Sequence, residues 1–249
     1  MSGSPPDVVP PDPVDPAAGT VPRWGLGDVL AGIALANLLL VVSQVVAYSI
    51  GGWTEMAQVP LWAVALLQIP MWVGWIIVVV WAARTKGNGV VADFGLRARW
   101  PDLPVGVALG LVVQLAVLPA IYWPILRLIG QTNEDLARPA QALADKAQGA
   151  FGWVVLTLVV VVGAPIVEEL FYRGLLLQAL RKRGLGDAVA CVICGAVFAA
   201  MHLQPLQFIG LFVLGTLLSY LTVRTGRLGP AIATHMVFNA VTVAVLAFS

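Results

Sequence analysis

The sequence predicts an all-α protein, a polytopic membrane bundle of about seven transmembrane helices. Of its 249 residues, 59% are hydrophobic and only 11% are charged, whereas a soluble domain usually carries about 25% charged residues. The mean hydropathy is +0.90. Several apolar runs reach the roughly 20 residues that a helix needs to cross a bilayer. One buried soluble core does not account for so many runs of this length.

The first 22 residues are predicted to form a disordered cytoplasmic tail, because they are rich in Pro and Asp and contain neither the basic start nor the apolar run of a signal peptide. Residues 23–249 are expected to form a membrane domain with its catalytic core at residues 151–249. The net charge of +1 and the lack of a basic, aromatic-rich patch give no sign of nucleic-acid binding.

Seven apolar runs are expected to cross the membrane. Pro119 and Pro124 are expected to bend the far end of the third run, and a kink is expected in the fourth at Gly163-Ala164-Pro165. The only cysteines, three residues apart in the fifth run, are expected to be buried packing residues rather than a disulfide or zinc pair. The predicted spans are residues 29–50, 61–83, 103–126, 152–183, 187–202, 206–223 and 229–248.

Lysine and arginine in the short loops predict the orientation, because cytoplasmic loops are enriched in these residues. The basic loops follow the second, fourth and sixth spans, so they all lie on one side of the membrane. The predicted protein therefore crosses the cell membrane with its N-terminus in the cytoplasm and its C-terminus outside. The segment 127–150 on the opposite side is mixed in charge, and a short surface helix is expected over residues 137–148. The basic loop residues are Arg84, Lys86, Arg97, Arg99, Arg181, Lys182, Arg183, Arg224 and Arg227.

Ionisable residues inside the predicted spans indicate a functional site. Glu168, Glu169 and Arg173 lie in the fourth span, and the only two histidines, His202 and His235, lie in the fifth and seventh. A charge at the bilayer centre costs at least ~2.5–3.5 kcal/mol, and such residues usually face a bundle interior or a water-filled cavity. Three charged groups in one span therefore predict a polar site inside the membrane.

Three pairs of residues spaced four apart define the faces that are expected to meet at this site. On a helix, this spacing places both members on one face. Helix rise places all three faces within the hydrocarbon zone, reachable from the cytoplasmic half. The pairs are Glu169/Arg173, Phe198/His202 and His235/Asn239.

The residue types suit hydrolysis. Glu168 can act as a base, and Glu169 can pair with Arg173 one turn further along the helix. Neutral imidazoles can accept protons or donate hydrogen bonds, and the amide of Asn239 can donate to an oxyanion. Phe198 is expected to pack against His202, whereas Tyr172 is expected to face away from Arg173.

A zinc ion is the one cofactor that these residues suggest. Glu168, His202 and His235 match a hydrolytic zinc site with an open fourth position. A metal-free mechanism is preferred, because no histidine follows Glu168 as in an HExxH pair on one helix. The cofactor therefore stays open between zinc and none.

The three motifs carry a resemblance. Glu168-Glu169-Leu-Phe-Tyr-Arg173 resembles the EExxxR motif of the CAAX protease and bacteriocin-processing family of intramembrane proteases. The segments 198–202 and 235–239 resemble its FxxxH and HxxxN motifs. Asp93-Phe-Gly-Leu-Arg97 resembles a short stretch often found upstream in that family. The three motifs EExxxR, FxxxH and HxxxN occur in the family's order and lie between residues 152 and 248.

This resemblance implies an endopeptidase whose site opens to the cytoplasm and whose substrate is a membrane-associated or C-terminal peptide. Glu168 and His202 would activate water, and His235 and Asn239 would serve the oxyanion. Glu169 and Arg173 would support them. The family is described both as metalloproteases and as metal-free, glutamate-dependent enzymes.

Two other functions would also account for Glu, His and Arg residues inside the membrane. One is a proton- or ion-coupled transporter, but the single proline-kinked polar span has no partner in the other half of the chain, as transporter repeats would have. The other is a scaffold without enzymatic activity that binds a peptide in the same cavity. The expected partners of the protein are a peptide or protein substrate and membrane lipid.

Overall fold

The structure is a computed structural model that describes residues 21–248. Every regular element in this part of the chain is helical, which confirms the all-α prediction. Within residues 21–248, six helices are long and apolar enough to cross a membrane, and a shorter apolar helix, α10 (Asp187–Met201), accompanies them. Residues 1–20 of the predicted tail lie outside the described part of the chain.

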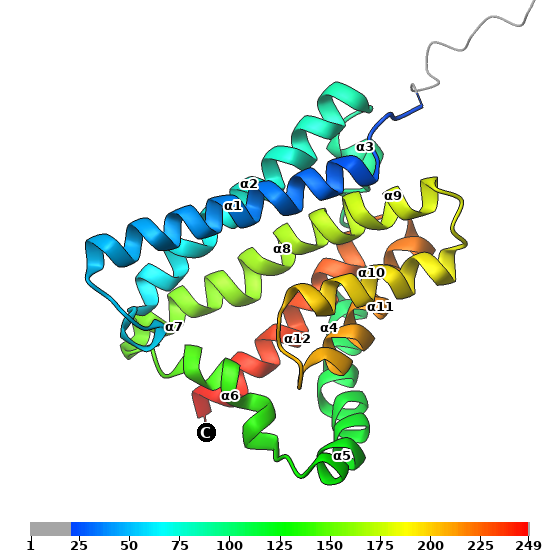
Figure 1. Cartoon of the computed structure of the whole chain (residues 1–249). Helices are drawn as coiled ribbons and strands as arrows, with labels where there is room; N and C mark the ends of the chain where they lie inside the picture. The colour runs from blue at the N-terminus through cyan, green and yellow to red at the C-terminus, as the bar shows by residue number, and fades with distance from the viewer. Residues whose placement is uncertain (1–20, 249) are drawn as a thin grey trace, which may run out of the picture.

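The helices follow the predicted order along the chain (Figure 1). The first two, α1 (Leu26–Gly51) and α2 (Leu61–Lys86), lie side by side and are joined through the one-turn helix η1 (Met56–Gln58). The third span comprises α4 (Asp102–Val112), the π-helical segment η2 (Val113–Val117) and α5 (Leu118–Ile129). The other helices outside the fourth span are α3 (Val90–Phe94), α6 (Asn133–Ala144), α11 (Phe208–Thr225) and α12 (Gly229–Phe248).

The fourth span is a continuous apolar helix of 34 residues, Gly149–Lys182, which packs against α1, α2, α10, α11 and α12. The kink expected at Gly163-Ala164-Pro165 takes the form of a π-helical segment that ends at Gly163. A second π-helical segment follows six residues later. Along the chain the span comprises α7 (Gly149–Thr157), η3 (Leu158–Gly163), α8 (Ala164–Glu169), η4 (Leu170–Leu176) and α9 (Leu177–Lys182).

The predicted surface helix is α6, which begins four residues earlier than expected. The reason is the sequence Thr132–Asp135, which forms a capping box. Asp135 N donates to Thr132 Oγ1 at 3.2 Å, and Thr132 N donates to the Asp135 carboxylate at 3.0 Å. The hydrogen bonds from Thr132 also lower the pKa of Asp135. α6 crosses from the end of α5 to the start of α7 (Figure 1).

Small residues let the membrane helices approach closely, as helix pairs in lipid require. Gly106 and Gly110 lie four residues apart on α4 and face α12, where a Cβ added to Gly106 would lie 2.7 Å from the carbonyl carbon of Ala233. α1 and α2 meet at Gly74, and α10 and α11 meet at Gly195 and Gly215, also with backbone against backbone.

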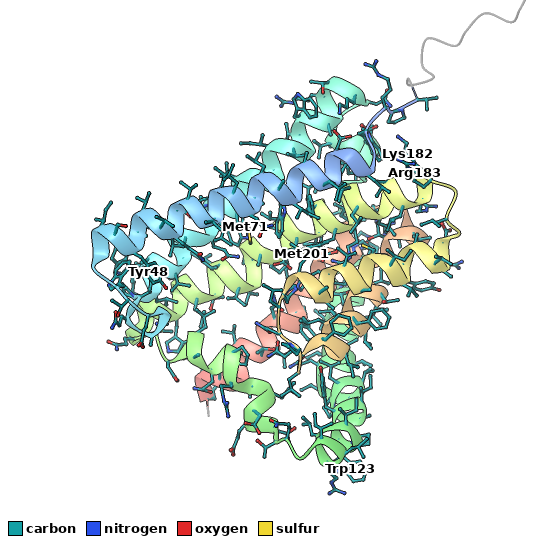
Figure 2. All side chains as sticks on the ribbon, in the orientation of Figure 1. Tyr48, Met71, Trp123, Lys182, Arg183 and Met201 are labelled. Carbon is teal, nitrogen blue, oxygen red and sulfur yellow. The ribbon has the colours of Figure 1, made fainter. Side chains whose placement is uncertain are left out.

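The outer surface of the bundle is apolar, as a lipid-facing surface should be. Leu30 on α1, Trp62 on α2 and Leu115 in η2 are each more than half exposed. Figure 2 shows side chains projecting outward along the outer helices, including Trp123 at the end of α5. The length and surface of these helices agree with a multi-pass membrane protein.

The loops predicted to share one side of the membrane do lie together at one end of the bundle. Lys182 Nζ donates to the carbonyls of Pro22 and Trp24, which precede α1. Leu228 N donates to Gly95 O at 2.8 Å, which joins the loop after the sixth span to the loop after the second. Lys182 and Arg183 are labelled near this end in Figure 2. We call it the basic end, and the opposite one the far end.

The loops at the far end are also joined to one another by hydrogen bonds. Lys146 Nζ, between α6 and α7, donates to the carbonyls of Ala57 and Val59 at 2.9 and 2.7 Å. Gln207 Nε2, between α10 and α11, donates to Leu136 O on α6 at 2.8 Å. The loops between the other pairs of spans are therefore joined here.

The α4–α12 contact leads to a prediction. We expect Gly106→Ala to lower the free energy of unfolding by about 1–3 kcal/mol, because the added methyl group overpacks a backbone contact. Gly27→Ala is the matched control, since nothing lies within 4 Å of a Cβ built on this helical glycine. It should be neutral or stabilise by up to ~1 kcal/mol. Thermal unfolding in detergent measures both, and equal effects would contradict the close contact.

Candidate active site

Two neighbouring glutamates on α8 have different surroundings. α8 is only six residues long and lies between two π-helical segments, which occur often at functional sites. The side chain of Glu169 is fully buried, whereas that of Glu168 is 12% exposed and lines a cavity. Consecutive helical residues point in directions about 100° apart, so one short helix serves both the packed interior and the cavity.

Glu169 is the centre of a buried ion cluster. Its Oε1 accepts a hydrogen bond from Arg173 Nη1 at 2.8 Å and lies 2.8 Å from Nδ1 of His235. The first contact is the predicted pair one turn apart on the fourth span. The second joins the fourth span to the seventh, so a single carboxylate oxygen holds two helices in register.

The remaining donors of Arg173 reach α11, which the sequence analysis did not include in the site. Nη2 donates to Gly215 O at 2.8 Å, and Nε lies 3.4 Å from Ser219 Oγ. The guanidinium also lies 4.6 Å from the ring centroid of Phe198. The only sequence signal for this contact was the pair of small residues, Gly215 and Ser219, four apart on the sixth span.

His235 connects the buried cluster to the cavity. Because a carboxylate can only accept, Nδ1 of His235 donates to Glu169 and thereby orients the ring. Nε2 then points toward Glu168, with 3.9 Å between Nε2 and Oε2. This separation is too long for a direct hydrogen bond and suits a bridging water molecule.

His202 occupies the C-terminal end of α10. Its Nδ1 lies 2.7 Å from Phe198 O, so the ring donates there and keeps the lone pair on Nε2. The ring of Phe198 is fully buried and packs against His202 with 4.6 Å between centroids. The next residue, Leu203, has φ of 53°, a left-handed conformation that is uncommon outside glycine. The chain therefore turns sharply directly after the histidine.

Asn239 is held in place by a hydrogen bond to a backbone carbonyl that Pro165 leaves without a donor. In the π-helical segment, Ala164 N donates to Val159 O, five residues back. The next donor would serve Val160 O, but Pro165 has no N–H. Asn239 Nδ2 donates to that carbonyl instead, at 2.8 Å. The amide keeps a second N–H for another acceptor.

Glu168, His202, His235 and Asn239 line one cavity of about 590 Å³. These residues come from three of the helices that the sequence analysis expected to converge. The remaining walls are mainly apolar, and α6 contributes its apolar face through Leu136, Ala137, Ala140 and Leu143. Roles within the reaction stay predictions, but one water-accessible space reaches all four side chains.

The cavity shows which half of the bundle is hollow at this site. We expected access from the half of the bundle nearer the basic loops. The lining residues instead come from the far half: the first part of α2, the end of the third span, α6 and the segment 204–207. Helix rise alone placed the residues at membrane depth but did not show which half is hollow.

Two further residues of the cavity wall were not predicted. Gln114 lies in η2 and donates from Nε2 to Thr242 Oγ1 on α12 at 3.2 Å. Trp72 on α2 also lines the cavity. Gln114 Oε1 and Trp72 Nε1 are buried and have no hydrogen-bond partner within residues 21–248. A glutamine in an otherwise apolar run was the signal available in the sequence.

Tyr172 differs from its prediction. We expected it to face away from Arg173, but its ring centroid lies 5.9 Å from the guanidinium carbon and the side chain is buried. The ring packs among Trp75, Phe171 and Phe198. The π-helical segment that begins at Leu170 changes the angle between successive side chains, so α-helical spacing misplaces this one. Both cysteines are buried, as predicted.

The donor arrangement does not fit a zinc site. Glu168, His202 and His235 were the ligands considered for a zinc ion. Within residues 21–248, no three His, Cys, Asp or Glu side chains are grouped so that they could hold a metal ion. We therefore assign no step to a metal.

Comparison with known proteins gives one match. Residues 150–241 match a protein-family model described as Type II CAAX prenyl endopeptidase Rce1-like. The matched residues contain all three motifs, so the resemblance to CAAX proteases is confirmed. The first three spans lie outside the match. Searches of curated proteins and of solved structures found no match.

The buried cluster leads to a prediction. Arg173→Ala should lower the free energy of unfolding by ~3–5 kcal/mol, because it leaves Glu169 as an unpaired buried carboxylate. Glu169→Gln in the same chain should restore part of this loss. Arg181→Ala is the matched control, since its pair with Asp187 is solvent-exposed and is worth about 1 kcal/mol or less.

Thermal unfolding in detergent and the yield of folded protein measure these effects. If Arg173→Ala is as stable as the unmodified chain but inactive, the arginine contacts substrate and is not a support for Glu169.

Proposed function

We propose, from the match of residues 150–241 to an endopeptidase family and from the cavity that their side chains line, that this chain is an intramembrane endopeptidase. It hydrolyses a peptide bond of a membrane-associated or C-terminal peptide. The observation that carries the proposal is the meeting of Glu168, His202, His235 and Asn239 at one cavity inside an apolar bundle.

Glu168 is the base in this proposal. Among the described residues that line the cavity, its carboxylate is the only one. A water molecule between Glu168 and His235 matches the 3.9 Å separation. Glu168 removes a proton from this water as the oxygen attacks the carbonyl carbon of the peptide bond. The same proton then passes to the leaving nitrogen as the C–N bond breaks.

His202 contributes through Nε2, because Nδ1–H is engaged by Phe198 O. This leaves a hydrogen-bond acceptor that can orient the attacking water toward the substrate carbonyl. Phe198 keeps the ring in place by packing against it. The assignment follows the role that the family resemblance implied for His202.

His235 and Asn239 stabilise the oxyanion of the tetrahedral intermediate. Asn239 offers the amide N–H that Val160 O does not use. His235 Nε2 holds the proton that Glu168 takes from water while the intermediate exists and donates it in a hydrogen bond to the oxyanion. It returns this proton to Glu168 before the C–N bond breaks, so that the proton can pass to the leaving nitrogen. Glu169 and Arg173 are positioning residues, because they orient His235 from behind and do not line the cavity.

Replacement of the base tests the reaction. We expect Glu168→Gln to reduce turnover to background while the melting temperature is unchanged or higher, because a neutral amide of equal size replaces a poorly solvated carboxylate. Glu134→Gln on α6 makes the same chemical change at an exposed position and should keep full activity.

The assay is a peptide library in detergent, analysed by mass spectrometry. Equal turnover of Glu168→Gln and the unmodified chain would refute the endopeptidase proposal in this form. A scaffold would show no cleavage in either case and would keep its binding.

A second replacement tests the oxyanion donor. Asn239→Ala should cost about 100–1000-fold in kcat, as loss of one oxyanion donor does elsewhere, with peptide binding retained. Asn37→Ala is the matched control, because Asn37 also donates from Nδ2 to a helix carbonyl, Ile33 O, at 2.8 Å. A stability loss without a specific loss in kcat would limit Asn239 to its bond with Val160.

A further inference from the structure

The stretch Asp93–Arg97, which resembles a segment found upstream in CAAX proteases, has no part in the reaction proposed above. Among the described residues that line the cavity, none belongs to this stretch. It forms the end of α3 and the start of the following loop, at the basic end of the bundle (Figure 1). Its contacts nevertheless reach both the fourth span, which carries Glu168, and α12, which carries His235.

Phe94 anchors the stretch to the fourth span. Its side chain is 1% exposed, and a Cβ added to Gly174 in η4 would lie 3.1 Å from the Cβ of Phe94. Gly174 directly follows Arg173, so this contact lies next to the buried ion cluster. Phe94 also packs against Trp24 with 5.0 Å between ring centroids, and Trp24 Nε1 donates to Asp93 Oδ2 at 3.1 Å. The stretch is therefore fixed beside the residues that orient His235.

Two backbone carbonyls of the same stretch hold the start of α12. Gly95 O accepts a hydrogen bond from Leu228 N at 2.8 Å, and Arg97 O accepts one from Gly229 N at 3.0 Å. N–H groups at the start of a helix have no partner within that helix, so an outside carbonyl can satisfy them. Because α12 begins at Gly229, both bonds act on its first turn and fix its position along its axis.

Position 95 requires glycine for two reasons. Its φ is 65°, in the left-handed region that side chains disfavour. A Cβ at this position would also lie 2.6 Å from Gly226 O and 3.1 Å from the Cα of Arg227. The loop before α12 therefore rests directly on the backbone of residue 95. Arg227 adds an ion pair with Asp102 at 2.6 Å, which ties the same loop to α4.

The site is sensitive to the position of α12 along its axis. Nδ1 of His235 lies 2.8 Å from Glu169 Oε1, and its Nε2 lies 3.9 Å from Glu168 Oε2. A slide of α12 by ~1.5 Å, the rise of one residue, is enough to lengthen the first contact beyond hydrogen-bond range. A misplacement of ~1 Å caused far from the reacting atoms can cost ~100-fold in rate. Whatever holds the first turn of α12 therefore also holds the site.

We propose that Asp93–Arg97 is a positioning clamp. It sets the distance between Gly174 on the fourth span and Leu228 at the start of α12, and thereby the position of His235 relative to Glu168. Its effect on the reaction rests on the proposed endopeptidase function, whereas its effect on α12 rests on the contacts alone. Because the clamp does not line the cavity, it acts on kcat and leaves substrate binding unchanged.

The kinetic test compares Gly95→Ala with Gly130→Ala. Gly130 also has a left-handed conformation, with φ of 67°, but nothing lies within 4 Å of a Cβ built on it. Both variants carry the same backbone strain, which melting temperatures in detergent measure, and only Gly95→Ala displaces the loop before α12. Gly95→Ala should lose at least tenfold in kcat with KM within twofold, and Gly130→Ala should keep both values. Equal kcat in the two variants, or a change confined to KM, would overturn the clamp.

Spin labels on Arg183→Cys and Phe248→Cys test the position of α12 without any assay of activity. Arg183 follows α9 at the basic end, Phe248 ends α12, and both are exposed. The two native cysteines are buried. Gly95→Ala should change the mean distance between the labels by about 1 Å or more, because its added Cβ must move away from Gly226 O. Gly130→Ala should leave the distance unchanged.

An unchanged distance in Gly95→Ala would refute the clamp. If the unmodified chain cleaves no peptide, the proposed function fails, and the distance measurement still decides whether the stretch positions α12.

A milder variant serves if Gly95→Ala does not fold. Arg227→Gln removes the ion pair with Asp102 and adds no backbone clash. It should lower kcat about threefold or more with KM unchanged, and Arg227→Lys should restore part of the loss. Arg181→Gln is the matched control, because its ion pair with Asp187 is exposed and lies outside the clamp. The same kcat in Arg227→Gln and Arg181→Gln would overturn the proposal.

Discussion

The buried carboxylate of Glu169 is the constraint on which the site depends. A charge at this depth is stable only if its partners are fixed around it, and the partners come from different helices. Arg173 is on the same span, while His235 is on α12, and Arg173 in turn engages α11 through Gly215 O. The cluster therefore aligns three helices and determines where the Nε2 of His235 points.

Departures from α-helical geometry explain how one span serves both packing and chemistry. α8 lies between two π-helical segments, and a third, η2, contains Gln114 on the cavity wall. Each wider turn changes the direction of the following side chains and leaves carbonyl groups with altered partners. Val160 O is the clearest case, because Pro165 cannot serve it and Asn239 does. A helix defect is thus used to position a proposed oxyanion donor.

The apolar bundle and the polar cavity are compatible because small residues carry much of the helix packing. In lipid, apolar side chains gain little from contacting each other, so close backbone approach supplies the attraction. Gly106 against α12 and Gly195 against α11 supply such contacts next to the two histidine-bearing helices. Large side chains are then left for the lipid surface and for the aromatic cluster around Tyr172. The cavity can remain open because these contacts hold its walls.

The sequence by itself determined the spans, their order, the shared end of the basic loops and the four motif residues that line the cavity, because each depends on local spacing or on composition. Four-residue spacing identified the Glu169/Arg173 pair. Helix rise placed His202 and His235 at a depth in the membrane from which they could meet this pair. Only the tertiary structure decided that Glu169 bonds to His235, that Arg173 bonds to α11, that Tyr172 is buried and that the hollow half is remote from the basic loops. These features depend on where helices cross and on π-helical turns, and neither is encoded in the regular periodicity of a single span.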